Sequence, residues 1–226
     1  MNAINNIWVL ILIVFSTYFL ISWVYKRLEI TNLKKALQIR NGLGLLNMKH
    51  GLGIVLFGVL FYVLYLEWRI VINYVEIPRL PILLIFYVLI FAIGYIAYKS
   101  SQKIIETENL YSLYSFNKAW FYFLVRFVFI LSYEFFFRGV LLFLAINQFG
   151  LIRAIIINVA MYLVLHLFDS KKERLGAIPF GIILCFISYK TGSIWCAFLL
   201  HLTLTVVYEI AIFYGSTLQS SKEKTI

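Results

Sequence analysis

The chain contains seven long runs of apolar residues separated by shorter polar segments. Lipid offers no hydrogen bonds to the backbone, so only helices and closed barrels cross a bilayer, and helical spans need about 20 apolar residues. The runs therefore predict an all-α protein, a polytopic membrane helical bundle of about seven transmembrane helices, with six to eight as the range. The seven runs are residues 7–25, 51–66, 80–98, 119–146, 151–168, 177–189 and 193–213.

The composition agrees with this fold class and excludes a soluble domain with a charged surface, because hydrophobic residues make up 63% and charged residues 13% of the chain. The net charge of +10 would also suit a nucleic-acid-binding protein, but the basic residues stand mostly at the ends of the apolar runs. That placement is typical of topology signals in cytoplasmic loops. We expect the lipid bilayer as a partner, and no nucleic acid.

The basic residues also predict the orientation of the chain. With the connection after the first run in the cytoplasm, fourteen Lys or Arg lie on that side and four on the other. The positive-inside rule then predicts an N-terminus outside and a C-terminus inside, in what we expect to be a bacterial cytoplasmic membrane. The fourteen stand at positions 26, 27, 34, 35, 40, 49, 99, 103, 118, 171, 172, 174, 222 and 224, and the four at 69, 79, 153 and 190.

Several local features refine the spans. The run 119–146 is long enough to be tilted or to extend beyond the lipid, whereas 177–189 is short and interrupted by Pro179 and Gly181. Basic and apolar residues alternate in 26–49, which predicts an interfacial helix there, and the polar stretch 99–118 is expected to be partly helical. Small residues in the second run offer close helix approach: Gly51, Gly53 and Gly58.

The residues that carry chemistry lie inside the later runs. Glu134 and Arg138 stand four positions apart, on one face of a helix. Ionisable groups are costly in lipid, so the pair is expected to face the bundle interior, as a functional site or as a structural ion pair. Two later runs each carry one histidine, His166 and His201. Three further polar residues accompany them: Asn158 two turns before His166, Thr205 one turn after His201, and His50, expected at the membrane interface.

The order of three motifs resembles the CAAX protease and bacteriocin-processing family, also called CPBP or Abi, of type II CAAX prenyl endopeptidases. The resemblance covers residues 115–213 and implies an intramembrane protease with its site among the later helices. It divides the chain into N-terminal transmembrane helices and connections (1–114), a protease-like core (115–213) and a cytoplasmic tail (214–226). The motifs are Glu134-Phe135-Phe136-Phe137-Arg138-Gly139, Tyr162-xxx-His166, and Thr191-Gly192-Ser193-Ile194-Trp195 followed by His201.

The resemblance also implies roles for individual residues. The family's first motif has two adjacent glutamates before the arginine, and the first activates water together with the histidine that matches His166. Here Tyr133 stands at that first position and Glu134 at the second. In the last motif the histidine that matches His201 binds the oxyanion with an asparagine, whose place Thr205 takes. The chain thus has the family's two histidines and its arginine, but it has no glutamate at the position of the family's catalytic carboxylate.

Three alternatives for the missing carboxylate remain open. A tyrosine with a pKa of roughly 10 cannot replace a carboxylate base at neutral pH, and Glu134 would need a rotated helix, since one position turns a side chain by about 100°. Glu173, in the loop after His166, is a substitute carboxylate or a solvated charge. Glu134, His166 and His201 also form a His₂–Glu set of the kind that binds zinc, although they are not contiguous.

Two functions follow as hypotheses. The first is an intramembrane endopeptidase that hydrolyses a membrane-embedded or lipid-modified peptide by His- and Glu-activated water. The alternative is a catalytically impaired relative acting as a membrane scaffold or regulator, which Tyr133 and Thr205 favour. A transporter would explain the charges inside the membrane, but the sequence contains no internal repeat of the kind that marks many transporters.

Overall fold

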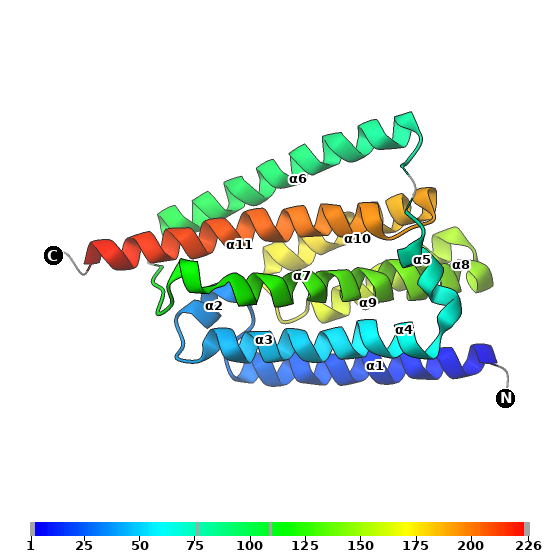
Figure 1. Ribbon diagram of the computed structural model, residues 1–226, viewed down its shortest axis with the longest axis horizontal. Helices are drawn as coiled ribbons and strands as arrows, with labels where there is room; N and C mark the ends of the chain where they lie inside the picture. The colour runs from blue at the N-terminus through cyan, green and yellow to red at the C-terminus, as the bar shows by residue number, and fades with distance from the viewer. Residues whose placement is uncertain (1–2, 76, 109, 224–226) are drawn as a thin grey trace.

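The computed structural model describes residues 3–75, 77–108 and 110–223, and every regular element in these ranges is helical. Helical rods run up and down one long axis, with the two termini at opposite ends of the bundle (Figure 1). Six of the helices in the described ranges are long and apolar enough to cross a membrane. The predicted all-α, membrane-spanning class is therefore confirmed, and the orientation in the membrane stays a prediction.

The rods alternate in direction along the chain. The apolar helix α9 (Leu151–Leu165) has 15 residues and is shorter than the six candidate spans. Short helices occupy the connections: α2 (Leu33–Leu37), η2 (Leu66–Arg69), α5 (Ile70–Asn73) and η3 (Phe116–Lys118). The rods are α1 (Ala3–Arg27), α3–η1–α4 (Gly42–Gly53, Ile54–Val59, Leu60–Leu64), α6 (Leu80–Thr107), α7–η4–α8 (Trp120–Glu134, Phe135–Leu141, Leu142–Phe149), α9 (Leu151–Leu165), α10 (Lys171–Thr191) and α11 (Trp195–Glu223).

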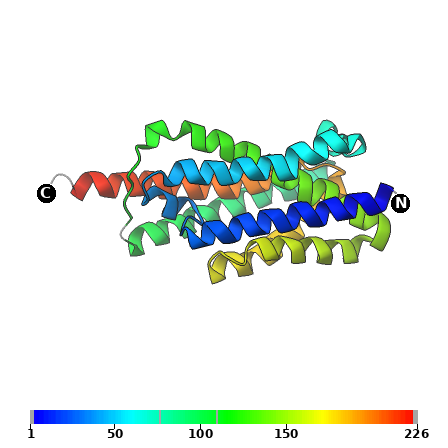
Figure 2. The ribbon, with the colours of Figure 1, turned by 90° about the horizontal axis from the view of Figure 1, so that it is seen from below.

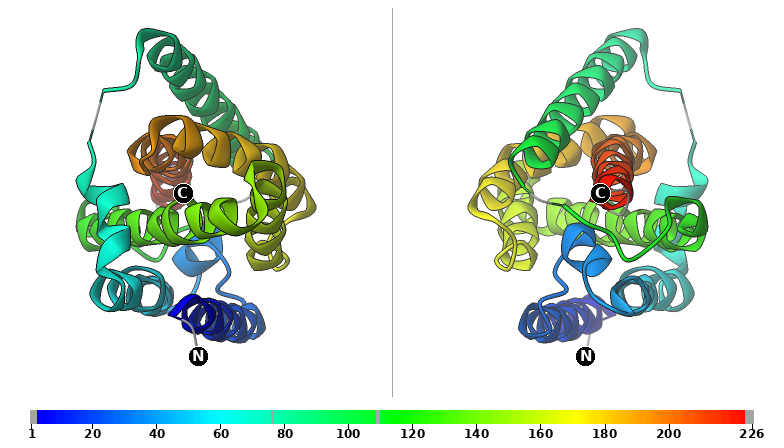
Figure 3. Two further views of the ribbon diagram at one scale, coloured as in Figure 1. Left: turned by 90° about the vertical axis from the view of Figure 1, so that its right-hand side faces the viewer. Right: turned by 90° about the vertical axis from the view of Figure 1, so that its left-hand side faces the viewer.

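The rod α7–η4–α8 is the centre of the bundle. Its most apolar window is 78% buried, against 17% for that of α6. The end-on views show it between a layer of α1 and α3–α4 on one side and α10 and α11 on the other, with α6 outermost (Figure 3). All seven residues of the π-helical segment η4 are buried. The first motif, from Glu134 to Gly139, therefore lies in the interior of the bundle.

Two π-helical segments, η1 and η4, pack against each other in the core. The rings of Phe57 and Phe136 lie 4.7 Å apart. Close approach of the rod α3–η1–α4 to α7 depends on glycine, since a Cβ on Gly58 would lie 2.5 Å from Ser132 Oγ and one on Gly53 would lie 2.4 Å from the Phe129 ring. Gly51 has open space around it, so the predicted role in close helix approach holds for two of the three glycines.

Two predicted boundaries are wrong. The second span begins at Gly42, after Asn41 turns the chain with a left-handed backbone (φ 62°), so residues 42–50 belong to the helix and not to a polar connection. Helix α10 is continuous from Lys171 to Thr191 and contains Pro179. It is longer than expected because Ser170 and Glu173 form a capping box at its start.

The remaining segments agree in part with expectation. Helix α6 continues to Thr107, so the polar stretch after residue 99 is partly helical. Helix α11 continues to Glu223, which places most of the predicted tail in a helix, and residues 224–226 lie outside the described ranges. Helix α2 lies at the end of the bundle where α1 ends and α3 begins (Figure 2). Its apolar residues Leu33 and Leu37 pack with Tyr122 and Phe213 in a buried cluster.

Candidate functional site

Glu134, Arg138 and His201 form a buried polar group between the central rod and α11. Arg138 Nε lies 3.4 Å from Glu134 Oε2, with both side chains fully buried, and His201 Nδ1 lies 2.5 Å from Glu134 Oε1. The Arg138 guanidinium also stacks over the ring of Tyr162 at 4.5 Å. The helical spacing that the sequence predicts thus turns both ionisable groups into the bundle, where a histidine from a third motif meets them.

The donor roles in this group follow from chemistry. An ionised carboxylate has no proton to give, so His201 Nδ1 donates to Glu134 and Nε2 is the ring nitrogen that remains for other contacts. Glu134 is therefore engaged on both oxygens, by a histidine and by an arginine. It holds these neighbours in place and is not a free base.

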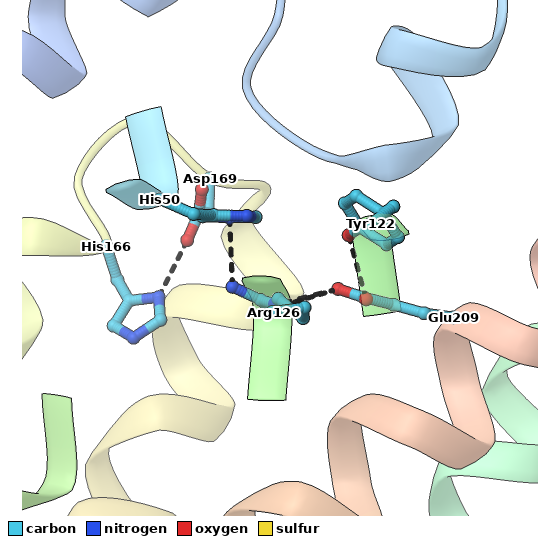
Figure 4. Close-up of polar contacts among 6 residues, drawn as sticks. All are labelled: His50, Tyr122, Arg126, His166, Asp169 and Glu209. Atoms are coloured by element: carbon cyan, nitrogen blue, oxygen red, sulfur yellow. Dashed lines mark hydrogen bonds and ion pairs between the residues drawn. The ribbon is translucent and has the colours of Figure 1, made fainter. Parts of the chain in front are cut away.

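His166 lies directly after α9 and pairs with a residue that the sequence analysis missed. Its Nδ1 lies 2.6 Å from Asp169 Oδ2, and the side chains of the two are 26% and 27% exposed (Figure 4). Glu173, the acid named from the sequence, caps α10 instead, and its carboxylate accepts from the Ser170 N–H at 2.8 Å. The only sequence signal for Asp169 was its spacing of three residues from a histidine.

Two tyrosine rings connect the histidines. The Tyr162 ring lies 4.5 Å from the His166 ring and 5.9 Å from Tyr133, and Tyr133 lies 6.0 Å from the His201 ring. Tyr133 is buried, with 5% of its surface exposed. Tyr133, at the position of the family's first glutamate, thus contacts the His201 ring directly and the His166 ring only through Tyr162. Thr205 is one turn after His201 on α11 and is also buried.

Asn158 supports the central rod from α9. Its Nδ2–H donates to the carbonyl oxygen of Phe137 in η4 at 2.5 Å, and its Oδ1 accepts from the Cys185 thiol at 3.2 Å. Asn158 is fully buried. These contacts link α9 and α10 to the π-helical segment that carries Arg138, which corresponds to the interhelical hydrogen bond considered from the sequence.

A second buried polar cluster lies two turns away on the same two helices. Arg126 contacts Glu209 with Nη2–Oε1 and Nε–Oε1 distances of 3.0 and 3.1 Å, and Tyr122 donates to Glu209 at 2.9 Å. Arg126 Nη1 also donates to His50 Nε2 at 3.2 Å (Figure 4). His50 is 5% exposed and stacks on Phe129, and its predicted position at the membrane interface stays a prediction. Glu209 is not among the residues predicted from the sequence, although it is an acid inside an apolar run.

The described residues do not fit the predicted zinc set. Within the described ranges, no group of three or more His, Cys, Asp or Glu side chains is placed to hold a metal ion. Glu134 faces His201 and the cationic Arg138, whose charge would oppose a bound cation, and His166 faces Asp169. The two histidines thus contact different carboxylates, His166 that of Asp169 and His201 that of Glu134.

The third motif positions the start of α11. Gly192 ends α10 with a left-handed backbone (φ 63°). Ser193 Oγ donates to the Tyr74 carbonyl at 2.8 Å, and Trp195 Nε1 donates to the Ile72 carbonyl at 2.7 Å. The motif therefore ties α11, and with it His201, to the segment that contains α5.

Comparison with known proteins gives one match. Residues 115–207 match the family model described as "Type II CAAX prenyl endopeptidase Rce1-like". No curated protein and no solved structure matches the chain. The matched segment contains the buried group of Glu134, Arg138 and His201 as well as the pair of His166 and Asp169. Over this segment the chain is similar to the type II CAAX prenyl endopeptidase (Rce1-like) family, which supports the family that its motifs predict.

Proposed function

We propose that the protein is an intramembrane endopeptidase that hydrolyses a peptide bond of a membrane-associated peptide with histidine-activated water. The family match supports a CAAX-type protease. The observation that carries the proposal is the meeting of motif residues inside the bundle, where His201 Nδ1 lies 2.5 Å from Glu134 Oε1 beside Arg138. Ionisable groups within a membrane are energetically costly, so a functional role is the default interpretation of such a group.

In this mechanism His166 is the general base. Its side chain is 26% exposed, against 13% for His201, so it is the more accessible of the two to water. The ring takes a proton from water as the water oxygen attacks the carbonyl carbon. The tetrahedral intermediate then breaks its C–N bond, and the proton passes from the ring to the leaving amine. A base of this kind contributes about 10²–10⁴-fold to the rate.

His201 and its partners stabilise the oxyanion. Glu134 holds the ring through Nδ1–H, and when both ring nitrogens are protonated the Nε2–H can donate to the developing negative charge. Thr205, one turn along α11, supplies a hydroxyl where the family has an amide. Arg138 balances the charge of Glu134, which would otherwise be buried with only a histidine as its partner.

The substrate class follows from the family and the fold. A peptide that reaches a site within a helical bundle from the bilayer must itself be embedded or carry a lipid. A C-terminal peptide with a prenylated cysteine is the first substrate to test, because the family description names prenyl endopeptidases.

The test is cleavage of a fluorogenic prenylated peptide by purified protein in liposomes, with an unmodified peptide for comparison. We expect wild-type cleavage that falls by about 10²-fold or more in His166→Ala and His201→Ala. Glu106→Gln, an exposed carboxylate-to-amide change on α6, is the matched control and should keep full activity. Cleavage that both histidine variants retain would refute the mechanism, and a chelator that abolishes it would show that a metal is required.

The alternative is a scaffold that binds the same peptides without cleaving them. The aromatic ring of Tyr133 beside His201 and Tyr162, where the family has a carboxylate, favours it. Absent cleavage in the wild type, together with saturable peptide binding that is equal in wild type and His166→Ala, would support the scaffold and reject the protease.

A further inference from the structure

We propose that Asp169 is a positioning residue that orients His166 for water activation. This inference rests on the proposed function. It names the carboxylate of that site, which neither the motif positions nor the family match identifies. The contact that carries it is the 2.6 Å distance between His166 Nδ1 and Asp169 Oδ2.

The contact fixes the protonation pattern of the ring. Because the carboxylate can only accept, Nδ1 carries the hydrogen and Nε2 keeps its lone pair. The base nitrogen is then the one that points away from Asp169. A carboxylate with this geometry also stabilises the positive charge that the ring gains when it takes a proton from water.

The turn between α9 and α10 holds Asp169 in place. The His166 N–H donates to the Leu163 carbonyl, and the Asp169 N–H donates to the His166 carbonyl, both at 3.0 Å. The next residue, Ser170, is the N-cap of α10 and forms the capping box with Glu173. The carboxylate therefore stands on a hydrogen-bonded turn with a capped helix directly after it, so its position beside the ring is defined by the backbone.

The other acids near the site already have partners. Glu134 contacts His201 and Arg138 and is fully buried, Glu209 is bound by Arg126 and Tyr122, and Glu173 accepts from the Ser170 backbone. Asp169 is thus the acid that contacts His166 among the described residues. Figure 4 shows the two side chains turned toward each other.

The chemistry needs no additional reactant. Asp169 stays a carboxylate throughout and accepts the Nδ1–H bond. The proton of the attacking water moves to Nε2 of His166 and then to the leaving amine, as in the proposed mechanism. The role of Asp169 is to select the ring tautomer and orientation, so it acts through His166 and does not touch the substrate.

The direct test reads the tautomer of His166 by NMR of protein labelled with ¹⁵N-histidine in detergent. The chain has only three histidines, so His50→Gln and His201→Gln assign the signals. In the neutral ring we expect a protonated Nδ1 and an unprotonated Nε2 in the wild type and in Glu106→Gln. Asp169→Asn and Asp169→Ala should shift His166 toward the other tautomer and leave the His201 signals unchanged. Unaltered His166 signals in both variants would overturn the inference.

The kinetic test uses the prenylated peptide. Replacing the carboxylate that orients a catalytic histidine lowers kcat by about 10⁴-fold in a well-studied hydrolase, and we expect a fall of about 10²–10⁴-fold in kcat for Asp169→Asn with little change in KM. Asp169→Glu should recover part of this loss. Loss of activity in Glu173→Gln with full activity in Asp169→Asn would assign the role to Glu173 and overturn the inference.

Failure of the inference and failure of the proposed function give different results. If the wild type cleaves and Asp169→Asn cleaves equally well, the inference fails and the protease remains. If the wild type does not cleave any peptide, the proposed function fails, and the role of Asp169 in water activation fails with it, whatever tautomer NMR finds for His166.

Discussion

Arg126 on α7 and Glu209 on α11 form an ion pair two turns from the point where Glu134 and His201 join the same two helices. Eight residues back along α7 correspond to eight residues forward along α11, as expected for antiparallel neighbours. Polar contacts therefore connect the two helices at two heights along the bundle, the Arg126 level (Arg126 and Glu209) and the Glu134 level (Glu134 and His201). The family motifs include only the residues of the Glu134 level.

The Arg126 level is expected to stabilise the fold. Arg126→Gln and Glu209→Gln should each lower the free energy of unfolding in detergent, and the double variant should lose less than the sum of the two. We expect a coupling energy of about 0.5–3 kcal/mol from the double-mutant cycle. Strictly additive losses would show that the pair contributes no interaction energy.

The Glu134 level should be sensitive to the loss of one partner. Arg138→Met leaves Glu134 buried beside a histidine alone, which should cost about 3–5 kcal/mol of stability. The combined change Glu134→Gln with Arg138→Met buries no lone charge and should recover part of this loss. Denaturant unfolding of the purified variants measures the loss in Arg138→Met and its recovery in the double variant. An Arg138→Met variant as stable as the wild type would contradict the prediction.

The packing of the rod α3–η1–α4 against α7 predicts opposite effects at two glycines. Gly58→Ala puts a Cβ within 2.5 Å of Ser132 Oγ and should destabilise the protein by about 1–3 kcal/mol. Adding Ser132→Gly should restore part of the stability. Gly51→Ala meets no atom within 4 Å and should be neutral or stabilise by up to about 1 kcal/mol. Thermal unfolding compares the three, and equal effects at both glycines would refute the packing argument.

The third motif should affect activity through the position of α11. Trp195→Phe removes the hydrogen bond to the Ile72 carbonyl and should cost about 1 kcal/mol of stability together with a lower kcat, because His201 lies on the same helix. Trp120→Phe, at a position that is 68% exposed, is the matched control. Equal peptide cleavage and stability in both variants would show that the contact does not position α11.

The sequence by itself determined the fold class and the first members of the site. Apolar runs and helical periodicity are local properties, so the spans, the shared face of Glu134 and Arg138, and the family motifs could be identified without a structure. The same local signals misplaced the start of the second span and broke α10 at Pro179. A left-handed turn at Asn41 and a capping box at Ser170 decide those boundaries.

The tertiary structure decided which charged groups meet. The sequence offered Glu134 and Glu173 as partners for His166, but Glu134 faces His201 and Glu173 caps a helix. Asp169 reaches His166 because both residues lie on one hydrogen-bonded turn, and Glu209 reaches Arg126 because two helices run antiparallel. Pairings of this kind depend on how elements are packed and oriented in space, which spacing along one helix does not specify.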